Sequence, residues 1–303
     1  MTCVLAIESE KLDEEVVVDE TILKAYGSGI YIEVGEKLTL KDLLYGLMLR
    51  SGNDAALMVA KYVGGTVEEF VKNMNDKASE IGMKNTTFVN PSGLDQDDSG
   101  NYSTAYDMAL LTKYAMQYDA YKEIVKTKSY ILKTNKKTYV WKNKNKLLNY
   151  DYITGGKTGY TEKAKRTLVS TASKDNINLI VVTIKDSDDW NTHTSLYEEA
   201  FDNYTAYKFL NKNTFSVVGD KYYKGTFYIK NDVYIPVKKT ELTKMIGKIE
   251  LEKKENYKTG SKVGEYKIYL EKELLYQEPI YIKKTSSNQD NISFFTKIKE
   301  LFK

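Results

Sequence analysis

Cysteine and histidine are scarce in this sequence, and each scarcity excludes a class of site. A single cysteine, Cys3, allows neither an internal disulfide framework nor a multi-cysteine metal centre. The only histidine, His193, would have to serve any Ser-His-Asp triad, and no Gly-x-Ser-x-Gly elbow accompanies it. We therefore expect His193 to be an exposed residue near a helix start. Any serine chemistry is expected to use a lysine base, and no metal or cofactor is predicted.

Strong charge and long apolar runs are also missing. A net charge of +3 over 303 residues, without a basic cluster interleaved with aromatics, gives no reason to expect nucleic acid as a partner. No apolar run approaches the roughly 20 residues that cross a bilayer. The first residues, "MTCVLAIESEKL", lack the positive start of a signal peptide and are typical of a helix interior.

The first half of the chain shows helical periodicity. Residues 38–50 predict a helix capped by Thr39, and residues 54–63 predict a second one that ends at Gly64-Gly65. A Thr-x-x-Glu capping box begins a third helix, and a further cap is expected before a fourth. The residues concerned are Thr66 and Glu69 for the helix over 67–83, and Ser103 for the helix over 104–117. Between these two helices, residues 85–103 predict a long loop.

The pattern then changes to strands. Strand-like runs cover 129–134, 137–143, 157–173 and 176–185, with Leu179–Ile184 expected to be a buried strand, and residues 195–210 predict a helix. Helices flanked by antiparallel strands predict an α+β domain over 1–210.

The rest of the chain predicts two smaller parts. Short alternating strands predict a small all-β domain over 211–285. Residues 286–303 follow as a linker and a basic amphipathic helix. Such a helix either lies in a membrane interface or packs on its own protein.

Two tripeptides occur twice each, and their contexts differ. Ser51-Gly52-Asn53 separates two amphipathic helices that can hold its polar side chains in place, although from the pattern alone a plain helix–helix turn capped by Asn53 or Asp54 is the better interpretation. Ser99-Gly100-Asn101 lies in the long loop, where such residues are ordinary. Lys157-Thr158-Gly159 precedes a strand pair, and Gly155-Gly156 before it should let a ligand approach the strand edge. Lys258-Thr259-Gly260 is expected to be a hairpin turn.

Taken together, "RSGNDAA", "NTTFVNPSGLD", "YSTAYDMA" and "GGKTGYT" resemble the serine-type D-alanyl-D-alanine carboxypeptidases of peptidase family S11, the low-molecular-weight penicillin-binding proteins. The resemblance is close over residues 1 to about 210, and the β-rich segment with its helix is similar to the family's second domain and membrane-surface anchor. It implies a penicillin-binding-protein/β-lactamase-like transpeptidase fold. Glycine at position 52 favours the carboxypeptidase branch over the Ser-Asp-Asn of class A β-lactamases.

The resemblance also implies a reaction and roles for six residues. A serine of Ser-x-x-Lys would attack the D-Ala-D-Ala carbonyl of a peptidoglycan stem pentapeptide and release D-alanine, and β-lactams would acylate the same serine. Ser51 would relay a proton to the leaving amine, and Asn53 would hold the substrate amide and orient the motif's lysine. Lys157 and Thr158 would bind the terminal carboxylate. Gly159 would leave room for the substrate, and the Tyr160 N–H would form half of the oxyanion hole.

One family motif has no counterpart here, because no serine in the sequence has lysine three residues later. The family commonly continues Ser-x-Thr-Lys with an apolar residue and Met-Thr, and this chain begins Met1-Thr2. We therefore expect the nucleophile, its lysine, the first strands and an export signal to lie upstream of Met1, and the 303 residues alone to be inactive. The complete protein would act outside the cytoplasm, on the outer face of the cell membrane. The alternatives are a natural remnant that binds stem peptides without cleaving them, and a membrane-surface interaction module.

Overall fold

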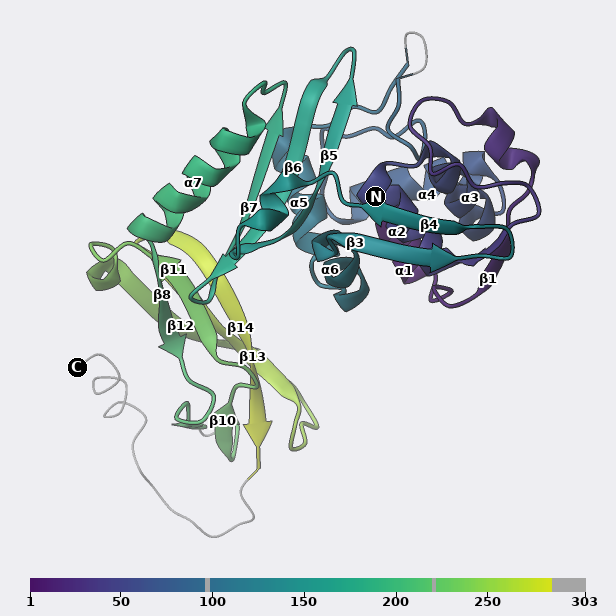
Figure 1. Ribbon diagram of the computed structural model, residues 1–303. Coiled ribbons are helices and arrows are strands. Elements are labelled where there is room, and N and C mark those ends of the chain that lie inside the picture. The colour runs from purple at the N-terminus through teal and green to yellow at the C-terminus, as the bar shows by residue number, and fades with distance from the viewer. Residues whose placement is uncertain (96–98, 220–221, 285–303) are drawn as a thin grey trace. The chain divides into compact units, whose positions relative to one another are not determined.

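The computed structural model describes residues 1–95, 99–219 and 222–284, and its contacts divide the chain into two compact units (Figure 1). The first unit comprises Met1–Lys174 and Asn178–Glu199, and the second comprises Asp175–Ile177 and the chain from Ala200 onward.

The first unit contains a group of helices around a shared apolar core. Leu40, Leu43, Leu44 and Leu49 are fully buried on one helix. The helices are α1 (Thr2–Glu8), α2 (Leu40–Arg50), α3 (Asn53–Gly64), α4 (Val67–Glu80), α5 (Ala105–Ala115) and α6 (Asp119–Lys126), with a 3-10 turn η1 (Glu20–Lys24) and a short ladder of β1 (Glu15–Val17) and β2 (Lys37–Thr39).

The helix caps follow the sequence in part. Thr39 forms a complete capping box with Asp42, each accepting a hydrogen bond from the other's backbone N–H. Thr66 caps α4 by accepting from the Glu69 N–H, whereas the Glu69 carboxylate accepts from Lys72. The predicted cap of α5, Ser103, is wrong by one residue.

At α5 the capping hydroxyl belongs to Thr104, which accepts from the Asp107 N–H at 3.1 Å. The Ser103 hydroxyl instead lies 2.8 Å from the Thr86 hydroxyl and so ties the long loop to the helix start. Adjacent Ser and Thr residues are equally good caps in sequence, and the neighbouring loop decides which of them turns toward the helix.

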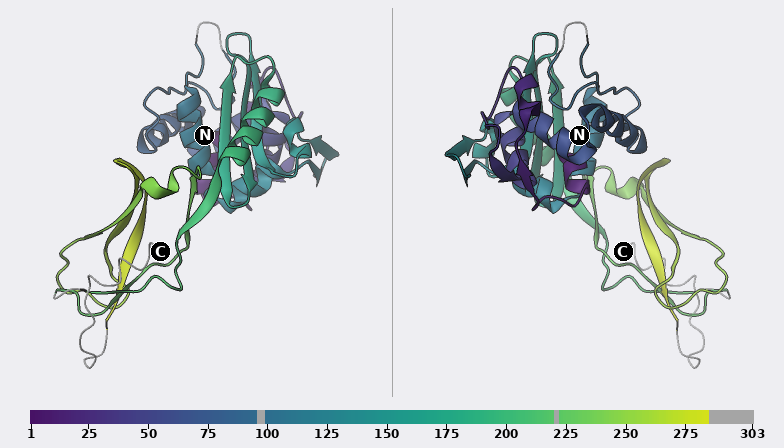
Figure 2. Two further views of the ribbon diagram at one scale, coloured as in Figure 1. Left: turned by 90° about the vertical axis from the view of Figure 1, so that its left-hand side faces the viewer. Right: turned by 90° about the vertical axis from the view of Figure 1, so that its right-hand side faces the viewer.

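A three-stranded antiparallel sheet forms the other layer of the first unit, in the order β5 (Ile153–Thr161), β6 (Lys165–Lys174), β7 (Ile177–Ile184). Helix α7 (Asp189–Asn203) covers one face of this sheet and the helical group covers the other, as the views in Figure 1 and Figure 2 agree. The apolar stretch of β7 is mostly half-buried rather than buried, because this strand lies at an edge of the three-stranded sheet.

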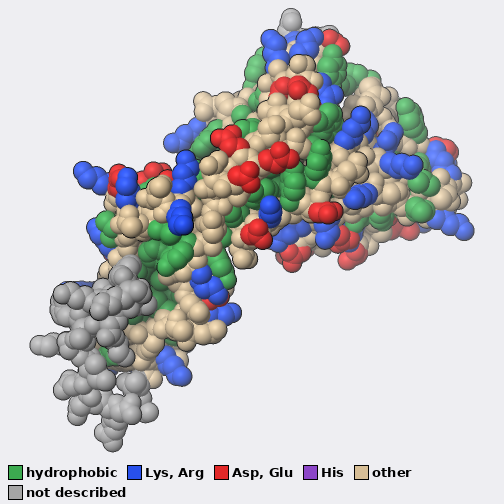
Figure 3. Space-filling view, turned by 60° about the vertical axis from the view of Figure 1, so that its left-hand side comes forward, with side chains coloured by type: hydrophobic (Ala, Val, Ile, Leu, Met, Phe, Trp, Pro, Cys, Tyr) green, Lys and Arg blue, Asp and Glu red, His purple; other side chains and the backbone are tan. Residues whose placement is uncertain are grey.

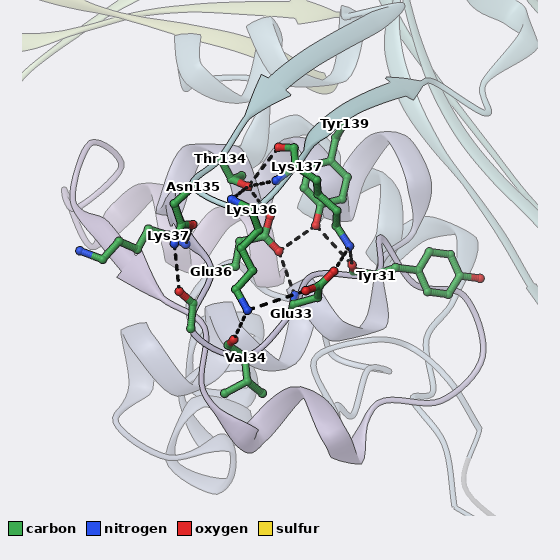
Figure 4. Close-up of polar contacts among 11 residues, drawn as sticks. Tyr31, Glu33, Val34, Glu36, Lys37, Thr134, Asn135, Lys136, Lys137 and Tyr139 are labelled. Atoms are coloured by element: carbon green, nitrogen blue, oxygen red, sulfur yellow. Dashed lines mark hydrogen bonds and ion pairs between the residues drawn. The ribbon is translucent and has the colours of Figure 1, made fainter.

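A two-stranded hairpin of β3 (Ser129–Lys133) and β4 (Thr138–Lys142) clamps the loop over residues 31–37 (Figure 4). The fully buried Glu36 carboxylate accepts hydrogen bonds from the Thr134 hydroxyl at 2.5 Å and from the Tyr139 hydroxyl at 2.8 Å. Lys137 donates to the Tyr31 carbonyl at 2.7 Å and pairs with Glu33. A buried carboxylate satisfied in this way fixes the loop to the hairpin tip.

The helix predicted over 195–210 is wrong at both ends. Helix α7 begins at Asp189, and residues Thr205–Leu210 form strand β8, which pairs with β11 (Val233–Val237). The apolar and aromatic residues after 204 fit a strand as well as a helix, and pairing with a strand distant in sequence decides between them.

The second unit is all-β, as predicted. Its main sheet has the order β12 (Met245–Leu251), β13 (Lys262–Leu270), β14 (Glu273–Lys283), β10 (Thr226–Tyr228), β9 (Val217–Val218). Fully buried core residues include Phe227, Val263, Ile268, Ile280 and Ile282.

Lys and Arg side chains are interspersed with Asp and Glu over the face that Figure 3 presents, so no extended patch of one sign forms there. Among the residues that the structure describes, no helix is long and apolar enough to cross a membrane. The predicted amphipathic helix over 286–303 lies outside the described residues.

Candidate active site

Ser51 occupies the junction between α2 and α3, in an uncommon backbone conformation. It ends α2 at φ 61° and ψ 44°, a left-handed geometry that glycine or asparagine usually supplies. Its N–H still bonds to the Leu47 carbonyl at 3.0 Å, so the helix holds the strained residue in place. Gly52 then begins α3. The Ser-Gly-Asn tripeptide is therefore mounted between two packed helices, as the sequence predicts.

Gly52 has a packing reason to be glycine. A Cβ atom at this position would lie 2.9 Å from both the Asp54 carboxylate and the Ile30 side chain. The close packing leaves no space for the aspartate found at the corresponding place in the Ser-Asp-Asn motif of class A β-lactamases.

We predict that Gly52→Ala lowers the free energy of unfolding by about 1–3 kcal/mol, since the added methyl group must displace packed neighbours. Urea titration followed by circular dichroism would measure the change. An unchanged midpoint would show that Ile30 and Asp54 can move aside at no cost.

Asn53 and Asp54 hold the preceding loop against the start of α3. The Asn53 side-chain amide donates to the Tyr26 carbonyl at 2.6 Å, and its backbone N–H donates to the Ser28 carbonyl at 2.8 Å. The Asp54 carboxylate accepts from the N–H groups of Ile30 and Tyr31. The loop over residues 26–31 thus forms one wall beside Asn53, and the hairpin clamp of Figure 4 fixes the loop's continuation.

Lys157, on strand β5, lies against Ser51 although the two are 106 positions apart. Its Nζ donates to the Ser51 Oγ at 2.5 Å and to the Thr158 carbonyl at 2.7 Å. Loss of water around the amine, together with repulsion from Lys144, lowers the pKa of Lys157 to about 7. At neutral pH this side chain is therefore divided between its charged and neutral forms.

A cavity of about 960 Å³ in the first unit brings the predicted residues together. Ser51, Asn53, Lys157, Thr158, Gly159 and Tyr160 all line it, so Asn53 and Lys157 face one shared cavity. The volume suits a small peptide or a drug-sized ligand.

The glycines near Lys157 have a different role from the one expected. A Cβ at Gly155 would overlap the Val125 side chain on α6, and a Cβ at Gly156 would overlap the backbone of β6. The space beside these glycines is thus filled by the protein itself, not left for a ligand, because β5 packs closely on both neighbours. At Gly159 a Cβ would meet the Thr167 hydroxyl across the strand pair.

The second copies of the tripeptides make different contacts, although Gly100 and Asn101 also line the cavity. Ser99 is exposed, and the side-chain Oδ1 of Asn101 accepts from the Val89 N–H at 2.8 Å, which braces the long loop. Lys258 is exposed in the turn between β12 and β13, as predicted.

His193 lies near the start of α7, as predicted, but the predicted exposure is wrong, because its side chain is fully buried. Its Nδ1 lies 2.7 Å from the Ser170 hydroxyl, and its Nε2 lies 3.0 Å from the Thr183 hydroxyl. Ser170 also contacts the Tyr197 hydroxyl at 2.7 Å. The polar flanks in sequence suggest exposure, whereas the imidazole is satisfied by hydroxyls of the sheet that α7 covers.

Sequence reasoning also missed a cationic group that lines the cavity: Lys144, Lys146 and Arg166. Arg166 pairs with the buried Asp189, and its guanidinium lies 5.4 Å from the Trp190 ring centroid. In sequence these residues look like ordinary surface charges. Arg166 lies on β6, whereas Lys144 and Lys146 lie at the start of the turn η2 (Lys146–Asn149), so only the folded chain brings them to one cavity.

Comparison with known proteins decides the family. The family model of D-alanyl-D-alanine carboxypeptidases, peptidase S11, matches residues 1–188. The chain belongs to this family. A second model, the C-terminal domain of penicillin-binding protein 5, matches residues 204–287. These matches confirm the prediction from the sequence that the chain belongs to a family of penicillin-binding hydrolases of the cell-wall peptidoglycan.

Individual relatives agree with the family models. The D-alanyl-D-alanine carboxypeptidase DacF of Bacillus subtilis is 33% identical over 297 residues, which cover 94% of this chain and 76% of the relative. The crystal structure of penicillin-binding protein 5 from Haemophilus influenzae matches with a TM-score of 0.70 over 93% of this chain and 88% of that chain, at 23% identity, which shows the fold. A mutant of the Streptomyces K15 DD-transpeptidase matches with a TM-score of 0.62 at 30% identity, covering 66% of this chain and 86% of that chain.

Proposed function

We propose that this chain provides the substrate-recognition and proton-transfer side chains of a D-alanyl-D-alanine carboxypeptidase that acts on peptidoglycan stem peptides. The observation that carries the proposal is the contact between Lys157 Nζ and Ser51 Oγ in the cavity that Asn53 also lines. Family membership supports the reaction class: removal of the terminal D-alanine through an acyl-serine intermediate.

In this proposal Ser51 relays a proton to the leaving amine and Asn53 binds the substrate amide. Ser51 can accept from Lys157, which supports a proton path along the two side chains. The side-chain nitrogen of Asn53 donates to the Tyr26 carbonyl, and this contact fixes the amide beside the cavity that Asn53 lines. Both residues lie on rigid helix ends, which suits groups that must align closely.

Lys157 and Thr158 are proposed to bind the terminal carboxylate of the substrate, with the Tyr160 N–H contributing to an oxyanion hole. An ammonium group and a hydroxyl in the lining of the cavity would favour peptides with a free carboxyl terminus. Gly159 keeps this strand free of a side chain, and the nearby Thr167 hydroxyl occupies part of the resulting space.

The sequence contains no Ser-x-x-Lys, so the family nucleophile and base have no counterpart in these 303 residues. We therefore propose that the chain binds stem peptides and β-lactams without being acylated by them. The proposed place of action is the outer face of the cell membrane, where peptidoglycan precursors reach the wall.

Binding of an acetylated tripeptide ending in D-Ala-D-Ala, measured by isothermal titration calorimetry, tests the proposal. Lys157→Ala should weaken binding about 10- to 100-fold, because a charge-assisted hydrogen bond to the carboxylate is lost. Lys258→Ala, in the second Lys-Thr-Gly, is the matched control and should bind normally. Affinity should fall as the pH rises through about 7, where Lys157 loses its proton.

Two further measurements test the carboxylate role of Lys157 and the proposed lack of acylation. The same tripeptide with an amidated C-terminus should not bind, and a fluorescent penicillin should not label the chain covalently. Equal affinity for the amidated peptide would refute the carboxylate role of Lys157, and stable labelling would refute the proposed lack of acylation.

A further inference from the structure

The contact between Ser51 and Lys157 has the chemistry of a nucleophile and its base. A serine hydroxyl reacts with acyl groups only when a neighbouring base removes its proton, and lysine can serve when its amine is neutral. Here the two atoms are 2.5 Å apart, within the range in which a proton can pass directly between them. The contact does not depend on a Ser-x-x-Lys motif, because its two residues belong to the Ser-Gly-Asn and Lys-Thr-Gly tripeptides.

The surroundings of Lys157 favour its neutral form. The charged side chains that line the same cavity are Asp95, Lys144, Lys146, Lys163, Arg166 and Asp189. The positive side chains in this list outnumber the negative ones, and one of the two carboxylates, Asp189, is already paired with Arg166. Desolvation and Lys144 lower the pKa of Lys157 to about 7, which suits a general base at neutral pH.

The backbone of Ser51 is fixed in one conformation, as a serine nucleophile requires. Its left-handed backbone conformation is kept in place by the end of α2 and the beginning of α3. Strained residues held by surrounding structure are frequent at reactive positions. Leu47, Met48 and Met108 line the same cavity and give it an apolar wall.

We infer that Ser51 and Lys157 form a serine–lysine dyad that hydrolyses small, uncharged, activated esters. Neutral Lys157 takes the hydroxyl proton while Ser51 Oγ bonds to the acyl carbon. The positive side chains of the cavity stabilise the charge that forms on the carbonyl oxygen. The bond to the leaving alcohol then breaks, and Lys157 returns the proton to that alcohol.

The same two side chains then hydrolyse the acyl-serine. Lys157 takes a proton from a water molecule as its oxygen bonds to the acyl carbon. The bond to Ser51 Oγ breaks, the serine recovers the proton, and the products are one carboxylic acid and one alcohol. No oxidant, metal or cofactor enters the balance.

This activity is distinct from the proposed carboxypeptidase function and selects the opposite kind of substrate. A ligand carboxylate bound at Lys157 would keep the amine protonated and so remove the base. Peptides ending in D-Ala-D-Ala and penicillins, which carry a carboxylate, should inhibit the dyad rather than acylate it.

Hydrolysis of p-nitrophenyl acetate by the 303-residue chain tests the inference. Ser51→Ala and Lys157→Met should each lower the enzymatic rate at least about tenfold, toward the buffer background. Lys157→Arg should not rescue it, because arginine keeps its proton. The second tripeptide copies supply matched controls: Ser99→Ala and Lys258→Met should hydrolyse the ester at the wild-type rate.

Two readouts separate a dyad from a structural role. The rate should rise with pH to a plateau, with a midpoint near 7, and rapid acid quench followed by peptide mapping should find the acetyl group on Ser51. An acetyl group on Lys157 or Cys3 instead, or an unchanged rate in Ser51→Ala, would overturn the inference. Inhibition by the D-Ala-D-Ala tripeptide reports separately on the carboxylate site: its absence would count against the proposed function and leave the dyad intact.

Discussion

Replacing Asp54 by alanine should lower the free energy of unfolding by about 3–5 kcal/mol, because three backbone N–H groups lose a charged acceptor. The carboxylate accepts from Ile30 at 3.0 Å, from Tyr31 at 2.7 Å and from Ala55 at 2.9 Å. Asp54 is only 6% exposed, so water cannot replace these bonds without opening the loop. Urea unfolding followed by circular dichroism would measure the loss.

Two variants control this experiment. Asp54→Asn keeps one carbonyl oxygen as an acceptor and should lose less stability than Asp54→Ala. Asp119→Ala removes a carboxylate that is exposed on α6 and should change the unfolding free energy by no more than about 0.5 kcal/mol. Equal stability of Asp54→Ala and wild type would show that the loop over residues 26–31 is held by its other contacts.

The effect of Asp54→Ala should extend from stability to ligand binding at the candidate site. The loop that Asp54 holds also supplies the Tyr26 and Ser28 carbonyls that bind Asn53. Binding of the D-Ala-D-Ala tripeptide should therefore weaken in Asp54→Ala even at temperatures where the variant is folded. In this way a buried carboxylate outside the reacting groups determines where Asn53 lies.

The sequence predicted those parts of the fold that local chemistry determines. Thr39 with Asp42 identifies the start of α2, and Gly64-Gly65 the end of α3, since caps and stops act on neighbouring residues. The six candidate residues of the cavity came from a family resemblance that short motifs carry. The structure places all six along one cavity, and their roles remain predictions.

The parts that the sequence did not predict depend on contacts between distant segments. The residues of strand β8 are predicted to end a helix because their pairing with β11 is not visible locally. Gly155-Gly156 suggested space for a ligand, whereas Val125 and the backbone of β6 occupy that space. The low pKa of Lys157 follows from burial and from Lys144, and neither can be read from the Lys-Thr-Gly motif itself.

His193 should make the protein less stable as the pH falls from 6.5 toward 4. Burial lowers the pKa of this imidazole to about 4, although Asp189 and Asp186 oppose the shift. The unfolded chain keeps a histidine pKa near 6.5, so between these values it binds a proton that the folded chain excludes. Stability is therefore unaffected by this group above pH 6.5 and decreases below it, by up to about 3 kcal/mol at pH 4.

The difference in unfolding free energy between wild type and His193→Gln, measured by urea titration from pH 7.5 to pH 4, isolates this contribution. Glutamine stays neutral and can still bond to Ser170 or Thr183, so the variant should lack the decrease, while the carboxylates that titrate in both proteins largely cancel. Because His193 is the only histidine, its ring-proton NMR signal needs no assignment and should not titrate in the folded protein above about pH 5. A midpoint near 6.5 would mean that the imidazole gains a proton without leaving its pocket. The packing of α7 on the sheet would then not depend on a neutral His193.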